Sequence, residues 1–348
     1  MSEAFDIAII GGGPGGYSTA LRAAELGKRV AMIERDATLG GTCLNRGCIP
    51  SKALISATHA IDSIRHAGEL GISATINGID YGTLHDYKKR IVDTMTQGLA
   101  GLLAHRGVTV FRGVASITGA ARPITVHIAA PADGQDVQRS VRSDVPEDIG
   151  PSYDITAQDV VLAMGSAPRQ LPGEPFRGAI IDSTRAMSMA MPHNAVIIGA
   201  GAIAAEFASM WNAAGCKVTM LIRKDRVLSG WDRRAGVTLT RELKRHGIDV
   251  IDRSTVTHID TGVNMGALVH YTSAKDGGST EHIAEGEFVL VAIGRDPLTS
   301  DGWIRDAGVT VDDHGFITTD GYGRTPVAGI WAVGDITEGH ALAHRAFE

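Results

Sequence analysis

The chain has 348 residues, of which 44% are apolar, enough for more than one ordinary domain. Its 33 Lys and Arg are outnumbered by 39 Asp and Glu, and no basic run is interleaved with aromatic residues, so nucleic acid is not an expected partner. No apolar run reaches membrane-spanning length and the first residues lack the pattern of a secretion signal, so we expect no membrane contact and a cytoplasmic location.

The chain opens with a predicted nucleotide-binding unit. Residues 5–10, FDIAII, predict a short buried strand that leads into the glycine-rich turn GGGPGG and then a helix. Glycine permits the tight turn and lets the backbone approach a pyrophosphate at the helix N-terminus. A second strand, KRVAMIE, ends in an acid placed to hydrogen-bond ribose hydroxyls. The candidate cofactor contacts here are Gly11, Gly13, Pro14, Gly16, Glu34 and Arg35.

Two cysteines follow in the segment GGTCLNRGCIPSK, which also contains the candidate cofactor contacts Gly41 and Thr42. The short spacing of Cys43 and Cys48 lets their sulfurs close a small ring, and Pro50 fits the first position of a helix. A Cys48 thiolate at that N-terminus would be stabilised, as a redox-active pair requires. The placement indicates a thiol pair facing a flavin; the alternative is two reduced, buried thiols without a role.

The third cysteine, Cys216, is expected to be a small buried residue. It lies in a second copy of the strand, turn and helix pattern, NAVIIGAGAIAAEFASMWNAAGCKVTMLI. Gly199, Gly201 and Ala204 occupy the three small-residue positions of this copy, which predicts a second dinucleotide site. Ala202 and Ile203, at the start of the helix, are further candidate contacts.

The second site differs from the first at the end of its second strand. The position equivalent to Glu34 holds Ile222, and Arg223 and Lys224 follow it. Two cations at the place of a ribose 2′-phosphate favour NADP over NAD. The alternative is a pair of solvated surface charges.

A repeated motif sets the expected domain boundaries. VVLAMGSAP at 160–168 and VLVAIGRDP at 289–297 each predict a strand that ends in a turn, at Gly165 and Gly294, where the chain passes between domains. The expected fold is α/β, with two Rossmann-like dinucleotide-binding domains and the second inserted into the first. The expected parts are residues 1–168 with an antiparallel meander at about 109–158, residues 169–288, and a return segment, 289–348.

Together, GGGPGGY, the acid after the second strand, GGTCLNRGCIPSKALI, the second glycine unit and TPVAGIWAVGDI resemble the pyridine nucleotide-disulfide oxidoreductases. The continuation IPSKAL favours the lipoamide dehydrogenase branch of that family. The resemblance implies an FAD-dependent dithiol–disulfide oxidoreductase, with FAD in the first domain and NAD(P) in the second. Electrons would pass between dihydrolipoamide, a Cys43–Cys48 disulfide, FAD and NAD(P). The alternatives are an NADPH-dependent reductase of a low-molecular-weight disulfide, similar to glutathione or mycothione reductases, and a non-catalytic FAD-binding fragment.

The resemblance also implies roles for single residues. Cys43 would be the thiol that exchanges with substrate, and Cys48 the thiol that faces the flavin. Lys52, four residues beyond Cys48 and so on the same helix face, would pair with Glu206 beside the flavin and the nicotinamide. Asp335, after Gly334 in AVGDI, would accept a hydrogen bond from the flavin ribityl chain. The expected catalytic residues are thus Cys43, Cys48, Lys52 and Glu206, and no metal site is expected.

Departures from the family qualify these expectations. Residues that complete the NADP pattern of glutathione reductases are replaced by Ser229 and Ala202. Family members continue for about another hundred residues into a dimerisation domain that carries a His–Glu base, and His340 and His344 do not match that motif. We therefore expect a monomer for this chain, and a homodimer that serves a 2-oxo acid dehydrogenase complex for full-length members.

Overall fold

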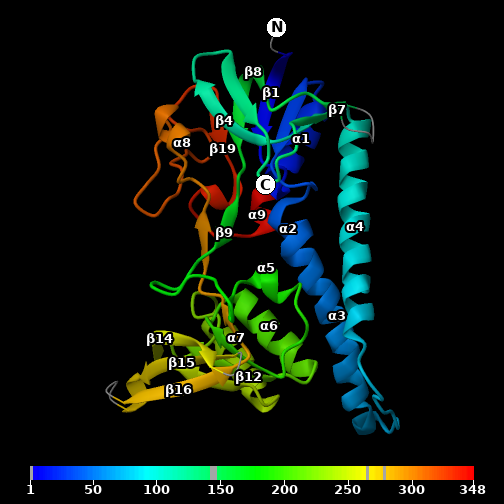
Figure 1. Ribbon diagram of the computed structural model, residues 1–348, viewed down its shortest axis with the longest axis vertical. Helices are drawn as coiled ribbons and strands as arrows, with labels where there is room; N and C mark the ends of the chain where they lie inside the picture. Colours follow the sequence, from blue (N-terminus) through cyan, green and yellow to red (C-terminus); the bar gives the residue numbers. More distant parts are fainter. Residues whose placement is uncertain (1–2, 142–146, 264–265, 277–279) are drawn as a thin grey trace. The chain divides into compact units, whose positions relative to one another are not determined.

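The computed structural model describes residues 3–141, 147–263, 266–276 and 280–348 (Figure 1). The chain divides into two compact units. Unit 1 contains Met1–Ile49, Ile91–Ala167 and Arg295–Glu348, and unit 2 contains Pro50–Arg90 and Pro168–Gly294. Residues 50–90, expected in the first domain, belong instead to unit 2, because Leu54 packs into the apolar core of that unit.

The sheet of unit 1 is parallel at its centre. In spatial order the parallel strands are β3 (Thr109–Arg112), β2 (Val30–Glu34), β1 (Glu3–Ile10), β8 (Ser152–Leu162) and β19 (Ile330–Ala332). Helix α1 (Pro14–Glu25) connects β1 to β2. Every residue of β2 is buried, which is typical of a parallel strand covered on both faces.

Antiparallel strands extend this sheet at both ends. β4 (Val114–Gly119) and β5 (Ile124–Ala129) pair antiparallel beside β8. β6 (Gln138–Ser140) and β7 (Glu147–Asp148) follow β3 at the opposite edge. In the segment where an antiparallel meander was expected, about 109–158, β4, β5 and β8 do pair antiparallel, but the first strand, β3, pairs in parallel with β2. The expectation missed this because alternation within a strand does not identify its neighbour.

Unit 2 has a second parallel sheet. Its spatial order is β10 (Ile180–Ile181), β17 (Phe288–Val291), β11 (Asn194–Ile198), β12 (Lys217–Ile222) and β13 (Asp249–Asp252). The helices that alternate with these strands along the chain are α5 (Ser183–Ala186), α6 (Ala202–Ala213) and α7 (Arg233–Arg245). A separate antiparallel sheet contains β14 (Ser254–Val263), β15 (Gly266–Ser273) and β16 (Glu281–Gly286). The sequence analysis did not predict this three-stranded antiparallel sheet.

The remaining elements connect these parts. Those that precede the sheets of unit 2 are α2 (Gly41–Arg46), α3 (Cys48–Arg65), η1 (Ala67–Leu70) and α4 (Tyr81–His105). The others are β9 (Ser166–Pro168), η2 (Ala274–Asp276), β18 (Arg295–Pro297), α8 (Gly302–Asp306), η3 (Gly334–Ile336) and α9 (Ala343–Phe347). Within the described ranges, none of the helices combines the length and apolar character needed to cross a membrane.

Candidate functional site

The glycine turn of unit 1 brings the end of β1 close to the start of α1. A Cβ atom at Gly16 would lie 1.8 Å from the carbonyl oxygen of Gly11, so a larger residue would push the helix away from the turn. Gly13 is the N-cap of α1, and Pro14 occupies its first position, where the missing N–H costs nothing. The turn thus presents the amide end of a twelve-residue helix, which suits an anionic pyrophosphate.

Glu34 fixes this turn from the end of β2. Its side chain is only 7% exposed. One carboxylate oxygen accepts a hydrogen bond from the Gly12 amide at 2.7 Å, and the other accepts one from the Asp36 amide at 2.9 Å. Burial raises the pKa of Glu34, and these two hydrogen bonds oppose that rise. The sequence placed the acid here but missed Gly12, whose amide holds it.

The cysteine segment packs against the same turn. A Cβ atom at Gly41 would lie 2.7 Å from the Cα atom of Gly13, so the two backbones are in close contact. Cys43 lies in α2, and Cys48 is the first residue of α3. Helix α3 begins two residues earlier than expected, which leaves Pro50 in the first turn, where proline is still tolerated.

Tyr17 of α1 lies near the thiol pair of Cys43 and Cys48. Its pKa is raised to about 12, first by burial and then by the nearby Cys43 and Cys48. Both cysteines are partly exposed. By contrast Cys216 is buried, and burial followed by the charge of Glu287 raises its pKa to about 12. The structure therefore contains one accessible thiol pair and one inert thiol.

A polar network in unit 1 connects segments that are distant in sequence. Ser166 donates to a carboxylate oxygen of Asp335 at 2.6 Å. Arg295 donates through Nε to the Ser166 hydroxyl at 2.7 Å and through Nη2 to Thr42 Oγ1 at 3.5 Å. The sequence analysis missed Ser166 and Arg295. Their signal was present, because each follows the glycine of one of the two repeated motifs, at Gly165 and Gly294.

The second glycine turn, in unit 2, repeats the geometry of the first. A Cβ atom at Gly199 would lie 2.2 Å from the Ala292 carbonyl oxygen. The equivalent distance in unit 1, from Gly11 to the Ala163 carbonyl oxygen, is 2.4 Å. Gly201 is the N-cap of α6, which begins at Ala202. Each turn is thus pressed against the end of a neighbouring parallel strand.

Two expected partners meet in unit 2. Lys52 Nζ lies 2.7 Å from Glu206 Oε1, which joins α3 to α6. The side chains are 56% and 32% exposed, so solvent weakens their attraction and the pair contributes little to stability. Lys52 also follows Cys48 by one helical turn on α3. A catalytic role for the pair stays a prediction.

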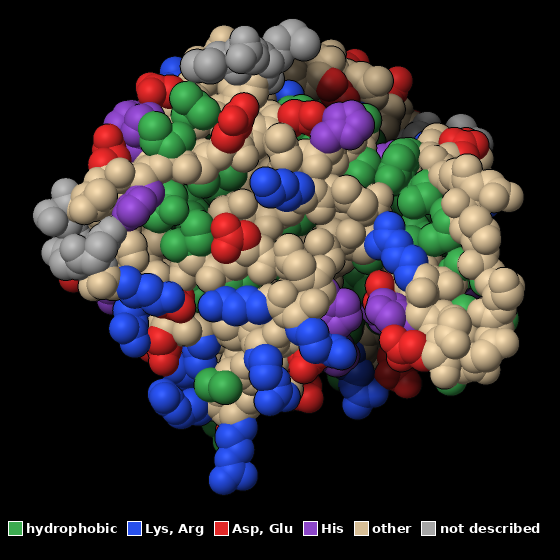
Figure 2. Space-filling model, turned by 90° about the horizontal axis from the view of Figure 1, so that it is seen from below, with side chains coloured by type: hydrophobic (Ala, Val, Ile, Leu, Met, Phe, Trp, Pro, Cys, Tyr) green, Lys and Arg blue, Asp and Glu red, His purple; other side chains and the backbone are tan. Residues whose placement is uncertain are grey.

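The cations after β12 are exposed, whereas Ile222 before them is fully buried. Neither Arg223 nor Lys224 forms an ion pair with any other residue that the structure describes. Figure 2 shows Lys and Arg side chains gathered on part of one face of the molecule. Helix α7 of unit 2 contributes exposed cations, namely Arg233, Arg234, Arg241, Lys244 and Arg245. This region can attract an anionic group.

The other candidates occupy turns and surfaces. Arg35 is exposed after β2, and Gly334 begins η3 next to Asp335. His344, in α9, packs its ring against Phe347 with centroids 6.2 Å apart. His340 is exposed and precedes that helix.

Comparison with known proteins agrees with this geometry. The family described as pyridine nucleotide-disulphide oxidoreductase matches residues 5–348. The chain is 35% identical over 347 residues to a dihydrolipoyl dehydrogenase of Chlamydia pneumoniae, covering 99% of this chain and 68% of the relative. It is 36% identical to dihydrolipoyl dehydrogenase 3 of Pseudomonas aeruginosa, covering 70% of that protein. The crystal structure of LpdA from Mycobacterium tuberculosis superposes with a TM-score of 0.83 at 27% identity, covering 99% of this chain and 70% of the other.

Proposed function

Because the chain belongs to the pyridine nucleotide-disulphide oxidoreductase family, we propose that it catalyses dithiol–disulfide exchange coupled to a nicotinamide, with dihydrolipoamide as the dithiol. The observation that carries the proposal is the accessible Cys43–Cys48 pair beside Tyr17 and the first glycine turn. We place FAD on that turn and NAD(P) on the second turn. For the domains, we propose that unit 1 holds FAD and unit 2 holds the nicotinamide.

The residues of unit 1 fit an FAD molecule. Gly13, Gly15 and Gly16 place no side chains of their own at the start of α1, where a pyrophosphate would lie against amide groups. The buried Glu34 carboxylate lies at the end of β2, where ribose hydroxyls can donate to it. Asp335, held by Ser166, is the acceptor that we assign to the ribityl chain. Bound FAD would accept the electron pair of the reduced cysteines and pass it on as hydride.

The chemistry of the chain itself is thiol exchange. With the pair oxidised, a substrate thiolate attacks the Cys43 sulfur, forms a mixed disulfide and releases Cys48 as a thiolate. The second substrate thiol then displaces Cys43, and lipoamide leaves as a disulfide after losing two electrons and two protons. Cys48 is the first residue of the eighteen-residue helix α3, where the helix dipole favours a negative charge on its sulfur. We assign Lys52 and Glu206 to positioning beside the nicotinamide.

Replacing each cysteine by serine tests the proposal. Cys43→Ser and Cys48→Ser are each expected to lower dihydrolipoamide-dependent NAD(P)⁺ reduction by at least about a thousandfold, because exchange requires both sulfurs. Cys216→Ser is the matched control and is expected to retain activity, since that thiol is buried. Dihydrolipoamide oxidation that survives in either variant of the pair would refute the assignment.

A second candidate rests on the cations after β12. Arg223 and Lys224, with Ile222 in place of an acid, favour NADPH, and NADPH commonly supplies electrons for reducing small disulfides. In this direction the same cysteine pair would reduce a low-molecular-weight disulfide. Parallel assays with dihydrolipoamide and NAD(P)⁺, and with NADPH and small disulfides, separate the two. The direction with the higher kcat/KM identifies the activity.

A further inference from the structure

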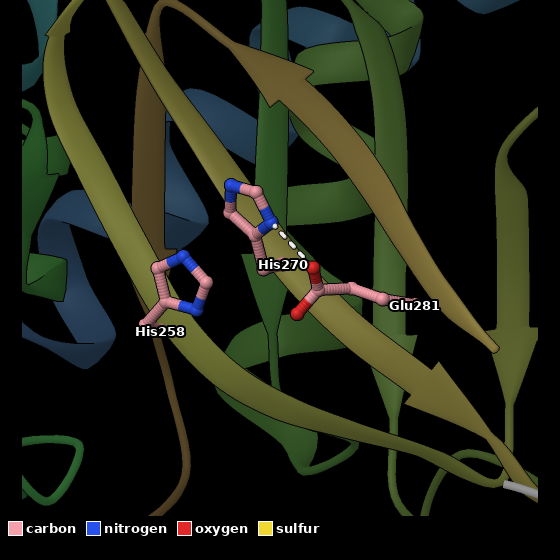
Figure 3. A group of neighbouring side chains, drawn as sticks. All are labelled: His258, His270 and Glu281. Atoms are coloured by element: carbon pink, nitrogen blue, oxygen red, sulfur yellow. Dashed lines mark ion pairs between the residues drawn. The ribbon is translucent and has the colours of Figure 1, made fainter. Parts of the chain in front are cut away.

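A cluster of two histidines and two carboxylates lies on one face of the three-stranded sheet in unit 2 (Figure 3). His258 on β14 is directly opposite His270 on β15 in the strand register. Glu281 on β16 is two residues from Ile283, the partner of His270 on the other side. Because side chains alternate between faces, Asp260 lies on the same face as His258. The opposite face of β15 is buried in the unit core through Val269 and Tyr271.

The four side chains converge. The two imidazole rings stack with centroids 3.9 Å apart, and ligand atoms of His258, His270 and Glu281 all lie within 4.8 Å of one another. His270 Nε2 lies 3.1 Å from Asp260 Oδ2, whereas its Nδ1 lies 3.4 Å from Glu281 Oε2. In Figure 3 the Glu281 carboxylate points at the His270 ring from the neighbouring strand.

His270 provides the observation that points to a ligand. Its side chain is 13% exposed, and within the described parts of the chain its buried Nδ1 atom forms no hydrogen bond. Asp260 lies on the Nε2 side, and because a carboxylate can only accept, the Nε2–H tautomer of His270 leaves a lone pair on Nδ1 that can bind a metal ion. Nδ1 faces the Glu281 carboxylate, so a cation is favoured between the two atoms, either a proton or a metal ion. Carboxylates that orient a metal-binding histidine in this way are common in metal sites.

We propose that His258, His270 and Glu281 bind a divalent transition-metal ion, with Asp260 orienting His270. Two imidazoles and one carboxylate suit Zn²⁺ or Cu²⁺ better than Mg²⁺ or Ca²⁺, which prefer oxygen ligands. Among the described residues, the ion-pair partners of Asp260 and Glu281 are these two histidines, so no Lys or Arg already neutralises the carboxylates. His258 and Glu281 are exposed, so their side chains can rotate to close the remaining distance around an ion.

Calorimetric titration with Zn²⁺ tests the site in protein freed of metal by a chelator. The parent protein carries Cys43→Ser and Cys48→Ser, so that thiolates do not bind the ion. We expect one site, weakened at least about tenfold by His258→Ala and by Glu281→Gln. His282→Ala is the matched control: this histidine neighbours Glu281 but stacks on Tyr271, with ring centroids 5.4 Å apart, on the other face. It is expected to leave the affinity unchanged.

A spectroscopic measurement makes the ligand assignment independent of affinity. Electron paramagnetic resonance of the Cu²⁺-loaded parent is expected to show nitrogen coupling from two imidazoles, and from one in His258→Ala. No Zn²⁺ binding in the parent, equal affinity in His258→Ala, or an equal loss in His282→Ala would overturn the proposal. Circular dichroism establishes that each variant is folded, and His258→Ala changes an exposed residue, so loss of fold is not expected.

Discussion

The two glycine turns share one architecture, and their third small residue differs, being Gly16 in unit 1 and Ala204 in unit 2. In both units the first glycine is pressed against the end of a neighbouring strand, at 2.4 Å for Gly11 and 2.2 Å for Gly199 as Cβ-to-oxygen distances. In unit 1 the third small residue, Gly16, has no room for a methyl group. In unit 2 the equivalent Ala204 has its methyl group fully buried. The second turn is therefore slightly wider, although the strands and helices around it are arranged in the same order.

The turns differ more at the end of the second strand. In unit 1 Glu34 is buried and accepts two backbone amide hydrogen bonds, one of them from the turn itself. In unit 2 Ile222 takes that position as an apolar core residue, and the polar groups, Arg223 and Lys224, lie outside. The same fold can thus present either an acceptor for ribose hydroxyls or cations for a phosphate, depending on two or three residues.

Of the changes that test these differences between the turns, replacing the third small residue of the first turn is expected to have the largest effect, a loss of FAD affinity. Gly16→Ala would place its Cβ 1.8 Å from the Gly11 carbonyl oxygen, so the helix must shift away from the pyrophosphate site. Overpacking of this kind costs about 3 kcal/mol, and we expect FAD affinity to fall about a hundredfold. The bound FAD per protein after gel filtration, and a flavin titration of the flavin-free protein, measure the loss.

The reciprocal change, Ala204→Gly, is the control. It removes a buried methyl group and adds backbone freedom to a helix, which costs about 1–2 kcal/mol of stability. The turn itself keeps its shape, so nicotinamide affinity is expected to change less than about threefold, within about 0.7 kcal/mol. If Gly16→Ala retains FAD as well as the unaltered protein does, the two turns are equally tolerant and the proposed difference in width is wrong.

Local chemistry explains what the sequence could predict. The glycine turns, the acid after β2 and the cysteine segment are each defined by a few adjacent residues whose backbone requirements are specific. The α/β fold and the family followed from them, and both are confirmed. The Lys52–Glu206 ion pair was reached through the family resemblance alone, since 154 residues separate its members.

Contacts between distant segments explain what the sequence could not predict. Ser166, Arg295 and Asp335 meet because strands far apart in the chain end at the same edge of unit 1. The cluster of His258, His270 and Glu281 is spread over three strands and shows no short ligand spacing. Periodicity reveals which face a side chain occupies but not which strand lies beside it.

A charge reversal after β12 tests the second difference between the units. Arg223 and Lys224 can form charge-assisted hydrogen bonds to a 2′-phosphate, so we expect NADPH to be preferred over NADH by about tenfold, roughly 1.4 kcal/mol. Arg223→Glu is expected to reverse the preference. The control, Arg35→Glu, changes the equivalent exposed arginine of unit 1 and is expected to leave the preference for NADPH over NADH unaltered. The preference is measured as the ratio of kcat/KM for NADPH to kcat/KM for NADH. A preference for NADH in the unaltered chain would contradict the assignment of Arg223 and Lys224 to a 2′-phosphate.

The smallest expected effect concerns the buried acid that unit 2 lacks. Because burial raises the pKa of Glu34, the folded chain keeps this proton to a higher pH than the unfolded chain. The stabilisation from this group is complete below the unfolded value of 4.5 and is lost as the pH rises through the folded pKa. Glu34→Gln removes the titration, so the unfolding free energy of wild type minus variant is expected to fall as the pH rises above the unfolded value of 4.5. Urea denaturation of flavin-free protein measures how steeply this difference falls with pH.

A second measurement repeats the titration with FAD bound. Ribose hydroxyls would then donate to the Glu34 carboxylate and stabilise its charge, so the dependence on pH should become weaker. An unchanged dependence on pH would show that no ribose reaches Glu34.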